Sequence, residues 1–313
     1  MPPPQSTSDL YATLQEYQLL LTLAGRRLWS RMLPGDFDRS WSQIGPSLVS
    51  LTSGAQLAAA RAAVDYVPIV LEETNQPDRP EALIRPRAFA GVASDGRSLA
   101  GLLEGAKVRA KEATKTRVVR DVEFGTLTTI RGLDGGDALA LGEKWLEQAL
   151  QTAVADAMRD ATAASVAVRP GLGWVRIASP PCCSRCAVLA GTFYRWNEPN
   201  RRHPGCDCLT QPVTEKDSDQ YLTNAADLLK RGQITDLSSN QRKRLDEGAN
   251  LNKVLNESRD RWRERMAADR KAAKDTWGGT PTSMPPGGVQ DFLSHLTNRV
   301  EALKGLRAAG IAD

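Results

Sequence analysis

The five cysteines of this chain all lie between positions 182 and 208, although the chain has 313 residues. A disulfide framework would join distant parts of the chain and would normally accompany a secretion signal. The first residues, MPPPQSTSDL, contain neither the basic start nor the apolar stretch of a signal peptide. The clustering therefore predicts a local metal site in a protein that stays in a reducing compartment.

The spacing within this cluster predicts two groups of metal ligands. In the first group two residues separate the cysteines, and in a tight turn both thiolates can then point at one cation. In the second group a Pro-Gly turn follows a histidine and precedes two further cysteines. Thiolates with one imidazole favour Zn²⁺ over Mg²⁺ or Ca²⁺. The candidate ligands are Cys183, Cys186, His203, Cys206 and Cys208.

A tetrahedral site has fewer places than this cluster has candidates. We take Cys183, Cys186 and Cys208 as three ligands, and either His203 or Cys206 as the fourth. Cys182 is expected to stay outside the site, because adjacent residues in a turn cannot both point inward. Four protein ligands leave no place for water, and the sequence has no HExxH motif. We therefore expect structural zinc. Reduced, unligated thiols are the simplest alternative, and a redox or catalytic thiol site is another.

Hydrophobic periodicity predicts helices over most of the remaining chain. Residues 173–178, 191–196 and 209–213 are instead rich in β-forming residues and predict short strands around the cysteines. A β-hairpin would carry the two ligand groups at its ends. Residues 73–86 contain three prolines and predict a loop. The expected helices cover residues 8–33, 38 onward with a break at Gly45-Pro46, 54–67, 97–115, 137–165, 217–231, 238–248 and 289–309.

These elements predict an α+β fold that is mainly α-helical. A helical N-terminal region would lead into a core of one helix and a small zinc-stapled β-hairpin, and an extended helical tail would follow. The predicted segments are 1–92 (helical), 93–215 (core), 216–277 (helical and basic), 278–288 (linker, GGTPTSMPPGG) and 289–313 (C-terminal helix).

Charge and hydropathy constrain the binding partners. The chain has 41 Lys and Arg against 37 Asp and Glu, and a net charge of +4 is too small to indicate a nucleic-acid-binding protein by itself. Residues 107–120 and 259–274 are locally basic. A solvated helix face is the simpler interpretation of the first window, and contact with DNA phosphates or an acidic partner is the alternative. No run of 18 apolar residues occurs, so no membrane span is expected.

The cysteine region resembles the C-terminal signature of the phage Mu F-like minor head proteins, also called phage head morphogenesis proteins. The similarity covers about residues 90–260. The stretch 246–256 resembles versions from phages of actinobacteria, which are often labelled capsid maturation proteases. The chain departs from the usual pattern at Ala190 and at Asp207, neither of which is a candidate ligand. The matching residues are Cys183-x-x-Cys186, Leu189, Gly191, Phe193 and His203-Pro204-x-Cys206-x-Cys208.

This resemblance implies a virion component that is made in the cytoplasm of the bacterial host and ends inside the capsid. Proteins of this family associate with the portal protein and with the major capsid or scaffold protein. They assist head assembly and the packaging or delivery of phage DNA. A non-enzymatic minor capsid protein is therefore the first functional hypothesis.

Two other hypotheses stay open. A capsid maturation protease with a Ser-His-Asp triad would need His203 or His295, the only histidines, whereas a Ser-Lys dyad would need neither. His295 is expected to be a surface residue, and we assign no catalytic residue. A zinc-knuckle nucleic-acid-binding module would place basic side chains of the cysteine region beside phosphates. Those side chains are Arg185, Arg195, Arg201 and Arg202.

Overall fold

A computed structural model describes residues 3–120, 127–200, 202, 205–221, 224–251, 253–254 and 288–313. The basic segment 259–274 and all but the last residue of the expected linker 278–288 lie outside these ranges. Within the ranges the chain is mainly helical with a small antiparallel sheet, which confirms the predicted fold class. The division into five segments stays a prediction.

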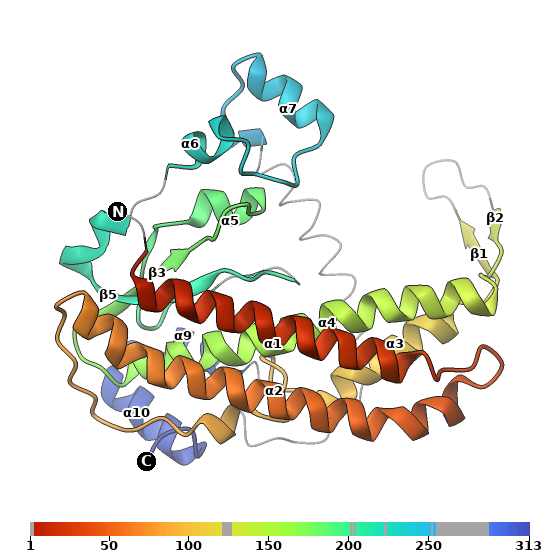
Figure 1. The fold of residues 1–313 in the computed structure, drawn as a ribbon, viewed down its shortest axis with the longest axis horizontal. Coiled ribbons are helices and arrows are strands. Elements are labelled where there is room, and N and C mark those ends of the chain that lie inside the picture. Colours follow the sequence, from red (N-terminus) through yellow and green to blue (C-terminus); the bar gives the residue numbers. More distant parts are fainter. Residues whose placement is uncertain are drawn as a thin grey trace.

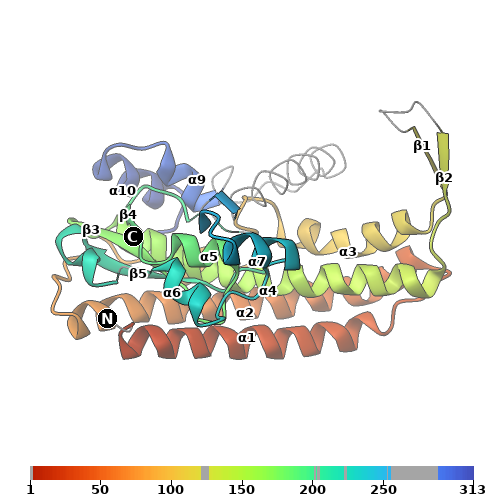
Figure 2. The same ribbon diagram turned by 90° about the horizontal axis from the view of Figure 1, so that it is seen from above.

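Four helices form an elongated body in which the long helices run lengthwise beside one another (Figures 1 and 2). The first begins three residues before the expected start, at Gln5. Its free backbone N–H groups are capped by the distant Glu73, whose carboxylate accepts from the amides of Gln5 (2.6 Å) and Ser6 (3.1 Å). The helices are α1 (Gln5–Trp29), α2 (Phe37–Glu73), α3 (Leu99–Ala113) and α4 (Gly135–Ala167), with a short 3₁₀ turn η1 (Pro86–Phe89) before α3.

The prediction of a break at Gly45-Pro46 and an end at Pro68 is wrong, because α2 continues through both prolines. Each interior proline removes one helical hydrogen bond and costs about 3 kcal/mol in an isolated helix. The apolar face of α2 nevertheless stays in register across both sites, from Ile44 and Leu48 to Val67 and Val70. Burial of this continuous face against α1 and α4 outweighs the local cost.

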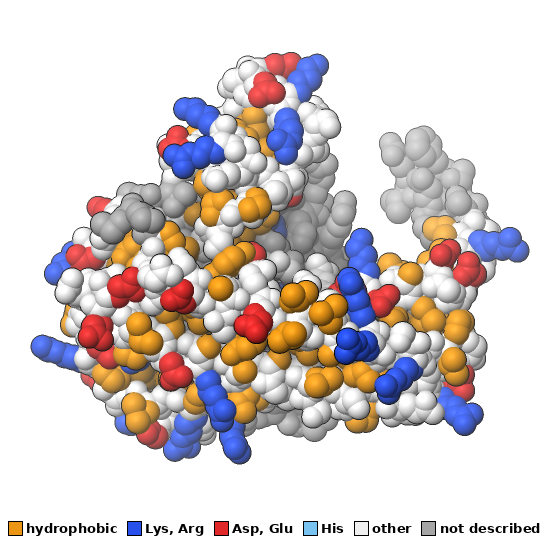
Figure 3. All heavy atoms as spheres, in the orientation of Figure 1, with side chains coloured by type: hydrophobic (Ala, Val, Ile, Leu, Met, Phe, Trp, Pro, Cys, Tyr) orange, Lys and Arg blue, Asp and Glu red, His pale blue; other side chains and the backbone are white. Residues whose placement is uncertain are grey.

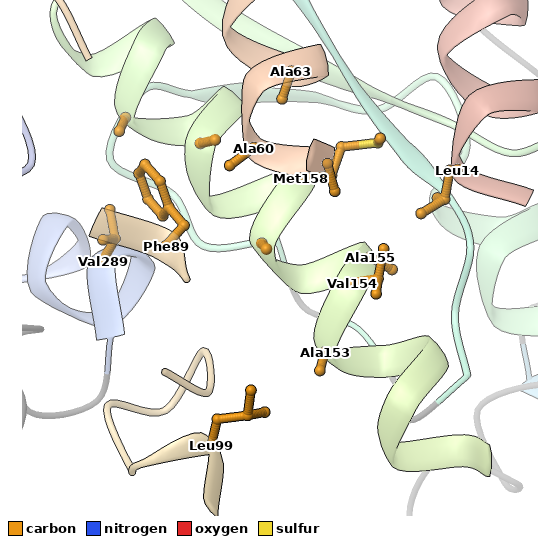
Figure 4. Packing of buried hydrophobic residues seen from close by; sticks show 14 of the residues in the cluster. Leu14, Ala60, Ala63, Phe89, Leu99, Ala153, Val154, Ala155, Met158 and Val289 are labelled. Carbon is orange, nitrogen blue, oxygen red and sulfur yellow. The ribbon is translucent and has the colours of Figure 1, made fainter. Parts of the chain in front are cut away.

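The central element is α4, which α1, α2 and α3 all contact. Asp134 caps its first turn, and every residue from Ala153 to Ala167 is buried. Figure 4 shows small side chains of α2, Ala60 and Ala63, beside Met158 of α4. Only 5% of the residues are aromatic. The close packing of alanines explains how a core can form with so few aromatic side chains.

The three strands predicted around the cysteines are confirmed, but they do not form a simple hairpin. The sheet order is β4-β3-β5, so the central strand β3 separates the two strands that follow the cysteine groups. Both neighbours are antiparallel to β3, and the register pairs Trp174 with Tyr194 on one side and Arg176 with Thr210 on the other. The strands are β3 (Leu172–Ile177), β4 (Phe193–Arg195) and β5 (Leu209–Thr214).

A two-stranded ribbon that the sequence did not predict projects from one end of the helical body (Figure 1). It consists of β1 (Arg117–Arg120) paired antiparallel with β2 (Leu127–Ile130). The last part of the basic window 107–120 is therefore a strand of this ribbon and not part of a helix.

The prediction of one helix over 217–231 is wrong. The chain there forms a 3₁₀ segment, η2 (Glu215–Tyr221), and a separate helix α6 (Ala225–Lys230) capped by the side chain of Asn224. The expected helix at 238–248 is confirmed as α7 (Ser239–Asp246), where Ser238 and Gln241 form a reciprocal capping box. A short helix, α5 (Ser184–Leu189), lies between β3 and β4.

The expected C-terminal helix is also divided in two, α9 (Gly288–Ser294) and α10 (Arg299–Ala308). Asn298 caps the second helix, which a single continuous helix would not allow. Arg299 secures this segment, because its Nη1 donates to the carbonyls of Val166 (2.9 Å) and Ala167 (2.9 Å) at the end of α4. Among the described residues, no helix is both long and apolar enough to cross a membrane.

Candidate metal centre

The two cysteine groups converge between the sheet and a small lobe. This cysteine lobe comprises residues 178–190, 205–208 and 224–251, with α5, α6 and α7, and Figure 1 shows these helices above the sheet and α1. Its apolar cluster contains Cys182, Cys186, Cys206 and Cys208 together with Leu228, Ile234 and Leu237.

Three buried sulfur atoms meet inside this lobe, and a fourth lies beside that of Cys186. The Sγ atoms of Cys186, Cys206 and Cys208 are buried and lie within 4.8 Å of one another, with 3.5 Å between those of Cys186 and Cys206. Cys183 is the N-cap of α5, and its Sγ accepts a hydrogen bond of 3.4 Å from the Cys186 amide. The turn predicted from the two-residue spacing is thus formed, and it brings the fourth sulfur to the Cys186 thiol.

One separation between sulfur atoms agrees with the geometry of a metal site. With Zn–S bonds of about 2.3 Å, the sulfurs of a tetrahedron are about 3.8 Å apart. The separation of 3.5 Å between the Cys186 and Cys206 sulfurs is close to that value. The three buried cysteines could therefore bind a metal ion, with Cys183 beside them as a fourth donor.

Ionisation of this cluster is unfavourable without a cation. Hydrogen bonding to the sulfurs of Cys183, Cys206 and Cys208, together with burial, raises the pKa of Cys186. A divalent ion reverses this preference, because metal binding releases the thiol protons.

The two remaining predicted residues differ in what the structure says of them. His203 lies outside the described residues. Cys182 is buried, and burial raises the pKa of its thiol to about 11. Its backbone pairs with the segment after α6, donating to the Gln233 carbonyl (2.9 Å) and accepting from the Thr235 amide (3.1 Å). Its sulfur, like that of Cys183, is not part of the buried trio.

The arm that carries Cys206 and Cys208 is held by α4. Arg159, which is 1% exposed, donates from Nε to the Cys208 carbonyl (2.9 Å) and from Nη2 to the Cys206 carbonyl. The hydroxyl of Thr152 accepts from the Gly205 amide at 2.9 Å. One face of α4 therefore sets the backbone path of both cysteines.

Two further contacts fix the lobe. Asp207, which departs from the usual family pattern, accepts a hydrogen bond of 2.7 Å from the Tyr11 hydroxyl of α1. The segment that carries Cys183 and Cys186 is held by Asp236, which accepts from the amide (2.6 Å) and the hydroxyl (2.9 Å) of Ser184. Asp207 thus has a structural partner within the chain.

A buried charged network lies behind the C-terminal cysteine arm. Asp156 accepts from Arg159 (3.1 Å), from Arg202 Nε (2.7 Å) and from the Ser94 hydroxyl (2.7 Å). The apolar stripe of α4 does not predict this network, because the charged residues lie among its alanines. The available signal was a charged trio, Asp156, Arg159 and Asp160, within an otherwise alanine-rich helix, since buried charges require internal partners.

A family model described as VG15 protein matches residues 1–230, which include the helical body, the sheet and the cysteine cluster. The chain belongs to the VG15 protein family. This is a phage-associated family of viral proteins. No curated protein and no solved structure shows significant similarity to this chain, so the assignment rests on the family model.

In this VG15 family member, the basic residues of α3 are largely neutralised within the chain. Lys107 pairs with Asp38 (3.1 Å) and Glu104 (2.7 Å), and Lys111 also pairs with Asp38. Lys115 pairs with Glu112 at 2.5 Å. For the part of the window 107–120 that lies in α3, these pairs favour the simpler interpretation, a solvated helix face, whereas residues 117–120 form β1.

The residues proposed for the alternative activities have other contacts. Arg202 binds Asp156, and Arg201 lies outside the described residues. His295 is exposed, as expected, and its Nδ1 lies 2.7 Å from the Asp291 carbonyl, to which its protonated form donates.

Asp160 makes the stability of this VG15 family member pH-dependent. Burial, with a smaller effect from Asp156, raises the pKa of Asp160 to about 7, while Gln290, Arg202 and Arg159 oppose the shift. Because the folded pKa exceeds the unfolded value, the folded chain retains a proton that the unfolded chain releases. This contribution is fully present below about pH 4 and is lost as pH rises through 7.

Asp160→Asn should remove this loss, because the amide stays neutral and its oxygen can still accept from Gln290 (2.6 Å). We expect the free energy of unfolding of the variant, relative to that of the wild type, to increase by roughly 2–4 kcal/mol from pH 5 to pH 8.5. Each pKa unit of the shift corresponds to about 1.4 kcal/mol. Equilibrium denaturant unfolding at both pH values measures this gain, with the exposed Asp219→Asn as control. A pH-independent difference would contradict the assignment.

Proposed function

We propose that this chain is a minor capsid protein of a phage, which acts with the portal protein during head assembly and DNA packaging or delivery. The observation that carries the proposal is membership of a phage-associated family over residues 1–230. The Mu F-like pattern of the cysteine region supplies the more specific role. The proposed place of action is the inside of the capsid, after synthesis in the host cytoplasm.

We also propose that Cys183, Cys186, Cys206 and Cys208 hold one structural Zn²⁺. The donor set is all sulfur, which zinc accepts and Mg²⁺ or Ca²⁺ does not. With four protein ligands the ion has no open position for water, so its role is to hold the lobe together. Under this proposal Cys206 takes the place for which the sequence left His203 as the alternative.

The surface supports a protein partner more than DNA. Figure 3 shows hydrophobic side chains exposed along the long helices, and α1 contributes Leu19 (60% exposed), Leu20 (56%) and Leu23 (43%). The α3 lysines are paired with acids of the same chain, which lowers their attraction for phosphates. We therefore place the portal and the major capsid or scaffold protein before DNA as partners.

Co-expression with the portal and major capsid proteins of the same phage tests the role. We expect the tagged chain to purify with the portal and to be incorporated into heads, while the major capsid protein keeps its length. Cleavage of the major capsid protein that depends on this chain would favour the maturation protease. Steeply salt-dependent duplex binding without portal binding would favour a nucleic-acid-binding module.

A matched pair of cysteine variants connects the metal centre to this role. Cys206→Ser removes a proposed ligand, whereas Cys182→Ser changes a buried cysteine outside the sulfur cluster. Cys206→Ser should fail to support head assembly in a phage that lacks its own copy, and Cys182→Ser should support it. Equal support by both variants would separate assembly from the metal centre.

A further inference from the structure

A buried arginine lies on the central strand beside the sulfur cluster. Arg176 of β3 is 1% exposed, and a fully buried guanidinium is costly unless an anion lies near it. Its Nη2 donates to the side-chain oxygen of Asn200, which is neutral. Asn200 is held in turn by the Thr210 hydroxyl (2.8 Å) and by Gln290, whose side-chain oxygen accepts from its amide (2.6 Å). These hydrogen bonds orient Arg176 but do not balance its charge.

The strand register places this charge next to the cysteines. Arg176 is directly opposite Thr210 of β5, and Cys208 precedes Thr210 by two residues. Cys208 lies just before β5 begins at Leu209, and Ala178, which follows Arg176 by two residues, packs against the apolar cluster that contains Cys208. Burial opposes the charge of Arg176, but thiolate charge on Cys208, Cys206 and Cys186 outweighs it and raises the pKa of the guanidinium.

The negative charge of the proposed metal centre requires a cationic side chain nearby. Four thiolates around a divalent cation carry a net charge of −2, and a buried charge of that size needs cations close by. Arg159 is one, because it lies against the carbonyls of Cys206 and Cys208. Arg159 also pairs with Asp156, and the thiols of Cys208, Cys206 and Cys186 become anions near Arg176 when metal binding releases their protons.

We propose that Arg176 is the built-in countercharge of the metal centre, and that it increases the affinity of the four-thiolate site for its cation. The inference rests on the proposed zinc site and extends it to a residue outside the ligand set. It also favours an all-cysteine site, because an imidazole ligand would reduce the charge that Arg176 balances.

Zinc affinity of the full chain, measured by competition with a chelator of known affinity, tests the proposal. Arg176→Met removes the charge and keeps the length of the side chain, whereas Arg176→Lys keeps the charge. Outer partners of metal ligands typically contribute about 10- to 100-fold in affinity. We expect a loss of that size for Arg176→Met and a loss of only a few-fold for Arg176→Lys.

The control is Arg169→Met, which removes another buried arginine, one that pairs with Asp78 (2.6 Å) instead of the cysteines. Its zinc affinity should equal that of the wild type. Wild-type affinity in a folded Arg176→Met variant would overturn the countercharge while leaving the zinc site intact. A wild-type chain that binds no zinc would instead overturn the metal centre itself.

A double-mutant cycle separates charge from packing. Cys183→His makes the proposed site less negative, from −2 to −1, so loss of Arg176 should then cost several-fold less zinc affinity than in the wild type. Equal costs in both backgrounds would overturn the electrostatic role. If the single variant Arg176→Met does not fold, the double variant Arg176→Met with Cys183→His tests the proposal instead. Recovered folding and zinc binding support the proposal, and continued failure contradicts it.

Discussion

Removal of the metal is expected to unfold the cysteine lobe while the helical body stays folded. Four of the eight buried residues in the apolar cluster of the lobe are cysteines, and the aliphatic side chains among the other four are Leu228, Ile234 and Leu237. A core of this size cannot stabilise three short helices without a staple. The helical body has its own extensive core, which includes Leu14, Leu48 and Leu150.

The expected effect is large. Structural zinc contributes about 10–16 kcal/mol of apparent binding free energy in small zinc domains, and that energy becomes folding energy where the apo site is unformed. Hydrogen exchange with and without a strong chelator measures the effect segment by segment. Amides of α5, α6 and α7 should lose protection, whereas those of α1, α2 and α4 should keep it.

Ligand variants provide the same test without a chelator. Cys208→Ser should expose the lobe to proteolysis even in the presence of zinc, whereas Cys182→Ser should resemble the wild type. Equal protection of the lobe in the loaded and chelated chains would show that the thiols pack without an ion. That result would favour the alternative of reduced, unligated cysteines.

Local patterns predicted the turn and the strands around the cysteines better than they predicted the lengths of the helices. The spacing of Cys183 and Cys186 specifies a turn by itself, and the structure forms that turn. The strands beside the cysteines were also evident, because β-forming residues occur there in short separate runs. The helix over 137–165 was predicted from its long apolar stripe and is confirmed as α4.

The errors occurred where distant parts of the chain decide the structure. Pro46 and Pro68 are strong local breakers, yet α2 continues because its face packs on α1 and α4. The start of α1 depends on Glu73, which is 68 positions away from Gln5. Two partners of Asp156, Ser94 and Arg202, come from distant segments, so the local charged trio in α4 could indicate a buried network but could not identify these two members.

Arg159→Met is expected to destabilise the whole chain, since this side chain joins the helical body to the cysteine arm. Its guanidinium satisfies two carbonyls, those of Cys206 and Cys208, and neutralises part of the charge on Asp156. Methionine fills a similar volume but leaves these buried acceptors without this donor. Removal of one partner from a buried ion pair typically costs about 3–5 kcal/mol. Lysine should not rescue the loss, because it lacks the planar donor fork.

Equilibrium unfolding in denaturant, followed by circular dichroism at saturating zinc, measures this cost. The control is Arg26→Met, which removes a side chain that is 54% exposed and pairs with Glu147 at the surface. Surface pairs contribute about 0–1 kcal/mol, so this variant should remain close to the wild type. If Arg159→Met lost no more stability than Arg26→Met, the cysteine arm would not depend on Arg159. Its position would then have to come from its other contacts, those of Tyr11 with Asp207 and of Thr152 with Gly205.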